Sequence, residues 1–218
     1  MYLPRPGGVN PPAPLFFAVG IKLMVSDKRA TVAEIIGPNL EEVADRGLLE
    51  QAVLFIGPGN GSGERVLLAG DRATPVGLAR WITRRKWGPF CASPILNICE
   101  QEDQPLLFTI SPCWSFLSKH VIHDAEGRRI GFVRRDRLLD YSGFRWAEFL
   151  GESNEGDGCF WGNGQQCLAQ MSAHDSQLRM MVNPSLTADP FSKMLLVAGA
   201  LWQYEKLVRR QIGEDGTE

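Results

Sequence analysis

The sequence predicts a mainly β protein in which about twelve antiparallel strands close into a barrel around a buried C-terminal hydrophobic helix. Three observations lead to this fold class. Hairpin patterns recur along the chain, an apolar helix follows the last of them, and no other segment has an apolar surface on all sides. At 218 residues, 44% of them hydrophobic, the chain is long enough to build one large core.

The N-terminal segment is set apart by its prolines. Residues 1–14 contain five of them, a composition that favours extended polyproline geometry and cannot form a helix or a central strand. No low-complexity linker divides the chain after residue 15. We therefore predict a flexible proline-rich arm over 1–14, a single barrel domain over 15–210 and a polar tail over 211–218.

Strands are predicted next, from turns rich in Asp, Asn and Gly between apolar flanks, which is the pattern of short hairpins. The four hairpins are 21–36, 65–82, 120–135 and 159–171. Further strands are predicted at 51–57, 93–99, 105–111, 144–150 and 177–183, with a short peripheral helix at 39–47. A sheet of about a dozen strands rarely stays open, and closing it leaves an interior that strand side chains alone cannot fill.

The segment at 189–210, DPFSKMLLVAGALWQYEKLVRR, predicts the helix that fills this interior. From Met194 to Trp202 no residue carries a charge or an amide, so this stretch has no polar face. It would span about 13 Å, whereas a bilayer core needs about 30 Å, so burial inside protein is expected. Asp189 and Pro190 suit the N-cap and first helical positions. Gly199 indicates either close backbone approach on its side of the helix or a glycine that is simply tolerated there.

Charge and cysteine content point to a cytoplasmic protein. The formal net charge is -2, so attraction to nucleic acid or anionic lipid has to come from local patches. The five cysteines form no C-x-x-C pair, and we expect no secretion signal, so reduced thiols are predicted. Cys159 and Cys167 are equidistant from Asn163, which predicts that they face each other across a three-residue loop.

A cluster of cations and tryptophans at 80–88, RWITRRKWG, is the candidate lipid- or phosphate-binding site. Cations attract phosphate, while indole rings suit the headgroup level of a membrane. The competing interpretation is a strand end with tryptophans in the core and solvated charges. The residues of the hypothesis are Arg80, Arg84, Arg85, Lys86 and Trp87, and a second basic run is formed by Arg128, Arg129, Arg134, Arg135 and Arg137.

Other motifs carry no expected chemistry. His120 and His123 are three apart on a predicted strand and point to opposite faces, so we expect no metal site. The loop at 57–64, GPGNGSGE, lacks the phosphate-loop lysine and precedes a strand instead of a helix. We therefore assign no catalytic residue, no metal and no cofactor.

Two phrases of the sequence resemble the superfamily that contains tubby C-terminal domains, phospholipid scramblases and LURP-one-related proteins. The first is PLLFTISPCWSFLSKHVIHDAEGRRIGFVRR at 105–135, with its D-x-x-G turn between strands. The second is QLRMMVNPSLTADPFSKMLLVAGALWQYEKL at 177–207, which is similar to the last strand and central helix of that superfamily. The resemblance implies a twelve-stranded barrel around one helix.

In several members, the resemblance further implies a basic outer surface that binds phosphoinositide or another anionic lipid. The acidic segment of scramblases is missing here, because only Asp189 lies in NPSLTADPF and calcium prefers six to eight oxygens. We expect a non-enzymatic binding module for an anionic phospholipid or a protein partner, cytoplasmic or at a membrane periphery, without a transmembrane span. The alternatives are an enzyme with a pocket at a barrel end and a nucleic-acid-linked regulator, although nucleic acid is not the expected partner.

Overall fold

The fold is taken from a computed structural model that describes seven stretches of the chain. They are residues 47–61, 63–85, 92–100, 104–113, 119–152, 157–186 and 189–214. All of them belong to one compact unit, Gly37–Glu218. Several predictions lie outside the described residues: the arm at 1–14, the hairpin at 21–36, the short helix except for Gly47, residues Lys86 and Trp87, and the tail from residue 215.

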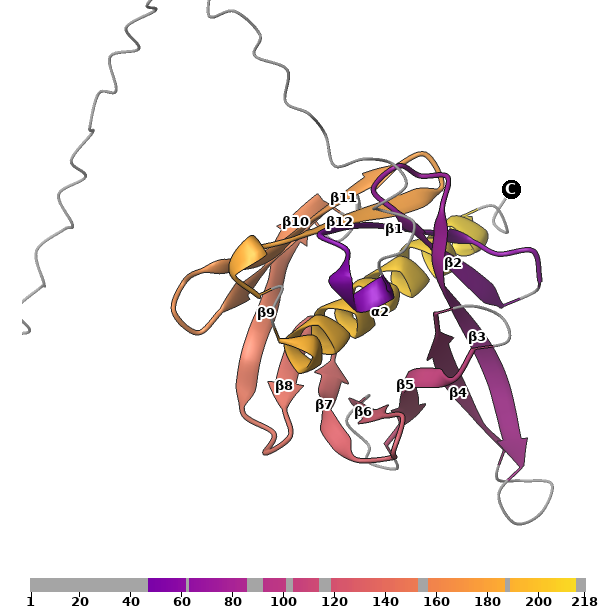
Figure 1. The fold of residues 1–218 in the computed structure, drawn as a ribbon, viewed down its shortest axis with the longest axis horizontal. Helices are drawn as coiled ribbons and strands as arrows, with labels where there is room; N and C mark the ends of the chain where they lie inside the picture. Colours follow the sequence, from indigo (N-terminus) through magenta and orange to yellow (C-terminus); the bar gives the residue numbers. More distant parts are fainter. Residues whose placement is uncertain are drawn as a thin grey trace, which may run out of the picture. The chain divides into compact units, whose positions relative to one another are not determined.

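Twelve antiparallel strands form a closed barrel, as predicted (Figure 1). Each strand pairs with its neighbours in the sequence, and the first pairs with the last through Val53↔Met181 and Ile56↔Leu178. Closure leaves none of the twelve strands at a sheet edge. The strands are β1 Val53–Pro58, β2 Glu64–Ala69, β3 Pro75–Arg85, β4 Ala92–Cys99, β5 Leu106–Pro112, β6 Lys119–Asp124, β7 Arg129–Arg134, β8 Arg137–Asp140, β9 Arg145–Glu152, β10 Asp157–Gly162, β11 Cys167–His174 and β12 Gln177–Val182.

The C-terminal helix α2, Pro190–Glu214, lies inside the barrel and continues past the predicted end at residue 210 (Figure 1). Every residue from Met194 to Leu201 is buried, and Trp202 is half-buried. The prediction that this part of the helix has no solvent-exposed face is therefore confirmed. Within the described part of the chain, no helix has both the length and the apolar character needed to cross a membrane.

Gly199 leaves room for side chains of the barrel wall to pack against α2. A Cβ atom at this position would lie 2.7 Å from Cζ of Phe160 and 3.1 Å from Cδ2 of Leu138. Both of these side chains are buried in the same core. The glycine therefore provides the space into which one ring of β10 and one side chain of β8 pack.

Polar contacts fix the position of the helix along the barrel axis. The Asp189 carboxylate accepts backbone N–H bonds from Phe191 at 3.1 Å and Ser192 at 3.3 Å, which confirms the predicted N-cap. Lys193, only 1% exposed, donates from Nζ to the Gln51 carbonyl at 3.2 Å, next to the short 3-10 helix η1, Leu48–Glu50. Burial lowers the pKa of Lys193, although the charge of Glu50 opposes this effect.

Two sequence predictions need correction. The sequence patterns do not predict β8, because this strand has only four residues and its first, Arg137, belongs to the second basic run. Cys159 and Cys167 do not face each other, because a bulge in the β10–β11 pair sets Cys159 opposite Gln170 and Cys167 opposite Trp161. Both thiols are free, and burial together with the neighbouring Cys159 thiol raises the pKa of Cys167 to about 11.

Candidate functional site

The two ends of the barrel differ in chemistry, and α2 runs from one end to the other. Its first turns lie near Gln51, just before β1, and its last turns contact the opposite end, where Tyr204 donates to the Ser176 carbonyl at 3.1 Å. We call the end where α2 begins the aromatic end, because Tyr141, Phe144 and Phe191 are exposed there. We call the other the basic end, because several cations belong to the strand ends, the turn and the last helix turns located there. These cations are Arg84, Arg85, Arg134, Arg135, Lys206, Arg209 and Arg210.

At the basic end, the β3–β4 hairpin extends past its neighbours (Figure 1, lower right). The register of β2 with β3 ends at the pair Glu64↔Arg80, whereas β3 continues to pair with β4 as far as Arg85↔Ala92. On the other side, the register of β4 with β5 begins only at Leu96↔Ile110. Residues 81–85 and 92–95 therefore form a two-stranded arm, which we call the β3–β4 arm.

The structure divides the predicted RWITRRKWG cluster between different environments. Arg80 pairs through Nε with Oε1 of Glu64 at 2.6 Å, so its charge is compensated. Trp81 packs against the hydrophobic core, as the competing interpretation of the cluster required. Arg84 and Arg85 are the last two residues of β3, on the β3–β4 arm. Lys86 and Trp87, which follow them in sequence, lie outside the described residues.

The second basic run does not form one surface. β7 has six residues and spans about 20 Å at 3.3 Å per residue, so its two ends lie at opposite ends of the barrel. Arg128 and Arg129 belong to the aromatic end, whereas Arg134 and Arg135 belong to the basic end. The arginines of this run are therefore divided between the two ends, because residues near each other in the sequence of a strand separate along the barrel axis.

The β7–β8 turn gives the basic end a cationic cavity. The pair Arg134↔Arg137 closes a two-residue turn, and Arg135 takes a positive φ of 55° in it. A cavity of about 260 Å³ is lined by both residues together with Arg137 and two acidic side chains. Arg137 pairs with Glu148 at 2.8 Å, whereas no carboxylate of the described residues forms a salt bridge with Arg134 or Arg135.

Asp136 connects this turn to the helix. Its Oδ1 accepts Lys206 Nζ at 2.5 Å and Gln203 Nε2 at 3.0 Å. Burial raises the pKa of Asp136, but these hydrogen bonds and the charges of Lys206 and Arg210 outweigh it and hold the pKa below its ordinary value. The carboxylate therefore stays ionised and holds the β7–β8 turn next to the last turns of α2.

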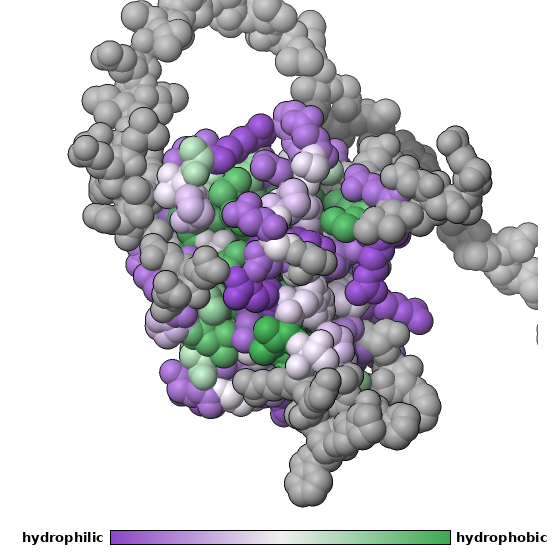
Figure 2. Space-filling view, turned by 90° about the vertical axis from the view of Figure 1, so that its right-hand side faces the viewer, coloured by the Kyte–Doolittle hydropathy of each residue, from purple (hydrophilic) through white to green (hydrophobic). Residues whose placement is uncertain are grey.

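Much of the surface is polar on the side of the molecule toward which the described part of α2 ends. In Figure 2, hydrophilic residues cover much of this side, with separate hydrophobic patches between them. Apart from the β3–β4 arm, whose two strand segments pair only with each other, the described strands expose no edge here, so a partner meets this arm, the turns and the helix end. These elements contribute arginine and lysine together with the carboxylates of Asp136, Asp157 and Asp175.

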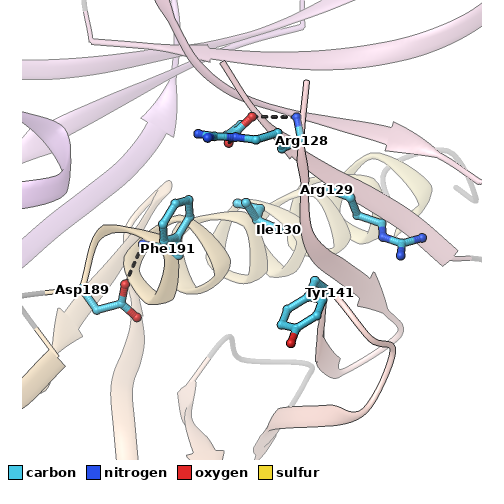
Figure 3. A pocket seen from close by; sticks show the side chains of 7 residues that line it. Arg128, Arg129, Ile130, Tyr141, Asp189 and Phe191 are labelled. Atoms are coloured by element: carbon cyan, nitrogen blue, oxygen red, sulfur yellow. Dashed lines mark hydrogen bonds and ion pairs between the residues drawn. The ribbon is translucent and has the colours of Figure 1, made fainter. Parts of the chain in front are cut away.

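The aromatic end holds a second cavity, of about 470 Å³. Figure 3 shows Phe191 and Ile130 side by side, Tyr141 below them and Arg128 above them. Tyr141 and Phe144 come from the β8–β9 turn and are 66% and 74% exposed, and Phe191 from the first turn of α2 is 46% exposed. The cavity is lined by Asp124, Arg128, Arg129, Ile130, Tyr141, Asp189 and Phe191.

The Asp124 carboxylate stabilises the β6–β7 turn at the aromatic end. Its side chain is 3% exposed and accepts the Arg128 backbone N–H at 2.7 Å and Arg128 Nε at 2.7 Å, which closes the β6–β7 turn. Burial raises the pKa of Asp124, but the side-chain and backbone hydrogen bonds from Arg128, and its charge, outweigh burial and lower the pKa. The D-x-x-G motif therefore has a folding role here.

We expect Asp124 to make stability depend on pH in acid. Because its pKa is lower in the folded than in the unfolded chain, the unfolded chain binds more protons, and stability falls as pH drops below about 4. Urea denaturation between pH 3 and pH 7 should show a smaller decline for Asp124→Asn than for the wild type. An unchanged decline in Asp124→Asn would contradict this assignment.

No metal cluster is present in the described residues: no group of three or more His, Cys, Asp or Glu side chains could hold an ion. His120 instead stacks on Trp202 of α2, with 4.3 Å between ring centroids. Burial lowers the pKa of His120, and the charge of Arg209 adds to the effect. This histidine therefore belongs to the packing between β6 and the helix.

No protein-family model matches the sequence, and no curated protein matches it. Among solved structures, the fold is similar to that of the X-ray structure of a protein from Arabidopsis thaliana, with a TM-score of 0.45 and 10% sequence identity. That match covers 67% of this chain and 91% of the Arabidopsis chain.

Proposed function

We propose that this protein is a non-enzymatic binding module whose basic end docks on anionic phospholipid at a membrane surface. The observation that carries the proposal is the β3–β4 arm, which extends past its neighbours and ends in Arg84 and Arg85. Lys86 and Trp87 follow directly in the sequence. A projecting hairpin whose strand ends in two arginines, followed in the sequence by a lysine and a tryptophan, has the composition that suits the interface between headgroups and acyl chains.

Other cations at the basic end support docking of this end on the membrane. Arg134 and Arg135 lie on the β7–β8 turn without a salt bridge to a described carboxylate, whereas Asp136 compensates the charge of Lys206 beside that turn. Each Lys or Arg close to an anionic membrane contributes about 1 kcal/mol, within a Debye length of about 10 Å. Because the formal net charge is -2, electrostatic attraction to an anionic membrane requires a local cationic patch of this kind.

We further propose that the chain belongs to the tubby, scramblase and LURP-one-related superfamily. The closed twelve-stranded barrel and the apolar C-terminal helix are the fold that the resemblance implies. The two resembling phrases contribute β5 to β7 and β12 with α2, and they therefore include the core helix and two of the strands that pack against it, β7 and β12. Fold alone does not determine function, so the lipid proposal depends on the chemistry of the basic end.

Reversing the charge of the two arginines of the β3–β4 arm tests the proposal. We expect Arg84→Glu with Arg85→Glu to abolish flotation with phosphatidylcholine liposomes that contain phosphatidylserine or phosphoinositide, at about 0.1 M salt. Loss of two attractions of about 1 kcal/mol each already weakens binding about thirtyfold, and the new negative charges weaken it further.

The matched control is Arg72→Glu with Arg129→Glu, which makes the same change in net charge at the opposite end of the barrel. This control variant should float as the wild type does. Unchanged flotation of the Arg84→Glu, Arg85→Glu variant, or equal loss in the control, would reject the proposed surface. Salt-dependent binding to duplex DNA without binding to liposomes would support the nucleic-acid alternative instead.

A further inference from the structure

The cavity at the aromatic end has an apolar interior. Phe191, Ile130 and Tyr141 line it from α2, β7 and the β8–β9 turn, three segments far apart in sequence (Figure 3). Its volume of about 470 Å³ lies within the range typical of small-molecule sites. Exposed aromatic rings that gather in a concave site are a feature of ligand-binding surfaces.

The two carboxylates of the cavity are already engaged within the chain. Both oxygens of Asp124 accept hydrogen bonds from Arg128, and its side chain is 3% exposed. Asp189 accepts the N–H groups of Phe191 and Ser192 and the Ser192 hydroxyl, so it closes the N-terminus of α2. Neither the helix terminus nor these carboxylates is therefore the recognition element.

The two arginines that line the cavity differ in whether carboxylates compensate their positive charge. Arg128 donates from Nε to Asp124 at 2.7 Å and from Nη2 to Glu126 at 2.9 Å, so two carboxylates surround it. Arg129 stacks over the Phe132 ring at 5.2 Å and makes no salt bridge with a described carboxylate. In Figure 3 its guanidinium lies to the side of Ile130, away from Phe191. The uncompensated charge at the rim is thus positive and next to an apolar interior.

We propose that this cavity binds an amphipathic monoanion, namely a medium-chain aliphatic carboxylate of about eight to twelve carbons. The chain packs between Phe191 and Tyr141 over Ile130, and the carboxylate pairs with the Arg129 guanidinium. This inference goes beyond the membrane-docking function, because it assigns a small-molecule ligand to the opposite end of the barrel.

Calorimetric titration with octanoate, decanoate and dodecanoate, each below its micelle concentration, tests the apolar part. Each buried methylene contributes about 0.8 kcal/mol, so affinity should rise about fourfold per methylene, or about fifteenfold per two-carbon step. Phe191→Ala should weaken dodecanoate binding at least tenfold, whereas Phe144→Ala, at an exposed ring that does not line the cavity, should leave it unchanged.

The charged part is tested by Arg129→Gln, which should weaken dodecanoate about tenfold or more and leave dodecanol unchanged. Arg72→Gln is the matched control, because Arg72 also stacks over a buried phenylalanine, Phe55, at 4.6 Å but lies outside the cavity. The Arg84→Glu, Arg85→Glu variant should bind dodecanoate as the wild type does, which separates this inference from membrane docking. No saturable binding, no dependence on chain length, or equal loss in Arg72→Gln would overturn the proposal.

Discussion

Replacing Leu201 by aspartate is expected to prevent the barrel from folding. Leu201 is 0% exposed on α2, inside the closed wall of strands, and belongs to the same core as residues from β1 to β12. The substitution removes a buried leucine and places a carboxylate in a dry interior, where its desolvation alone costs several kcal/mol. The total exceeds about 5 kcal/mol, which is comparable to the stability of a whole domain. Circular dichroism and urea denaturation would measure the loss.

The control for this substitution is Leu150→Asp on the outside of β9. Leu150 is 57% exposed, so the new carboxylate stays in water and stability should change by about 0.5 kcal/mol or less. A Leu201→Asp protein with the urea midpoint of the wild type would mean that the helix is not enclosed.

Replacing Gly131 by valine is expected to lower the free energy of unfolding by about 3 kcal/mol or more. A Cβ atom at Gly131 would lie 2.4 Å from the Leu139 carbonyl oxygen and 2.6 Å from Cδ2 of Leu195. The carbonyl oxygen belongs to the neighbouring strand β8, so it cannot move without disturbing the sheet. Leu195 is on α2, so a side chain at position 131 would also collide with the helix.

Gly164→Val in the β10–β11 turn is the comparison for this effect. A Cβ atom at Gly164 would meet nothing within 4 Å, and this glycine is not among those with positive φ. We expect a change of about 0.5 kcal/mol or less from thermal or chemical denaturation. Equal losses in Gly131→Val and Gly164→Val would show that general backbone effects, and not the approach of the helix, determine stability.

Much of the fold could be predicted from local sequence patterns. The Asp189 N-cap, the uncharged stretch of α2 and the D-x-x-G turn at Asp124 each have a local physical cause, and the structure confirms each. β8 was missed because strand signals are weak in four residues that begin with Arg137. The bulge that displaces Cys167 from Cys159 also depends on packing that sequence spacing does not record.

The candidate sites could be predicted only in part. The composition of RWITRRKWG indicated a cationic surface, but the inward position of Trp81 and the pairing of Arg80 with Glu64 depend on strand register. The separation of Arg129 from Arg134 depends on the length of β7 along the barrel axis. The cavity at the aromatic end could not be predicted, because barrel closure brings together three elements with no common motif.

Native-state hydrogen exchange of the α2 amides tests the enclosed helix most directly. In low denaturant, the amides from Leu196 to Trp202 should exchange only through global unfolding, with the same free energy as the slowest strand amides, while the exposed last turns near Arg209 exchange faster. Exchange of the Leu196–Trp202 amides through an opening of lower free energy, while the strands stay protected, would contradict a barrel built around this helix.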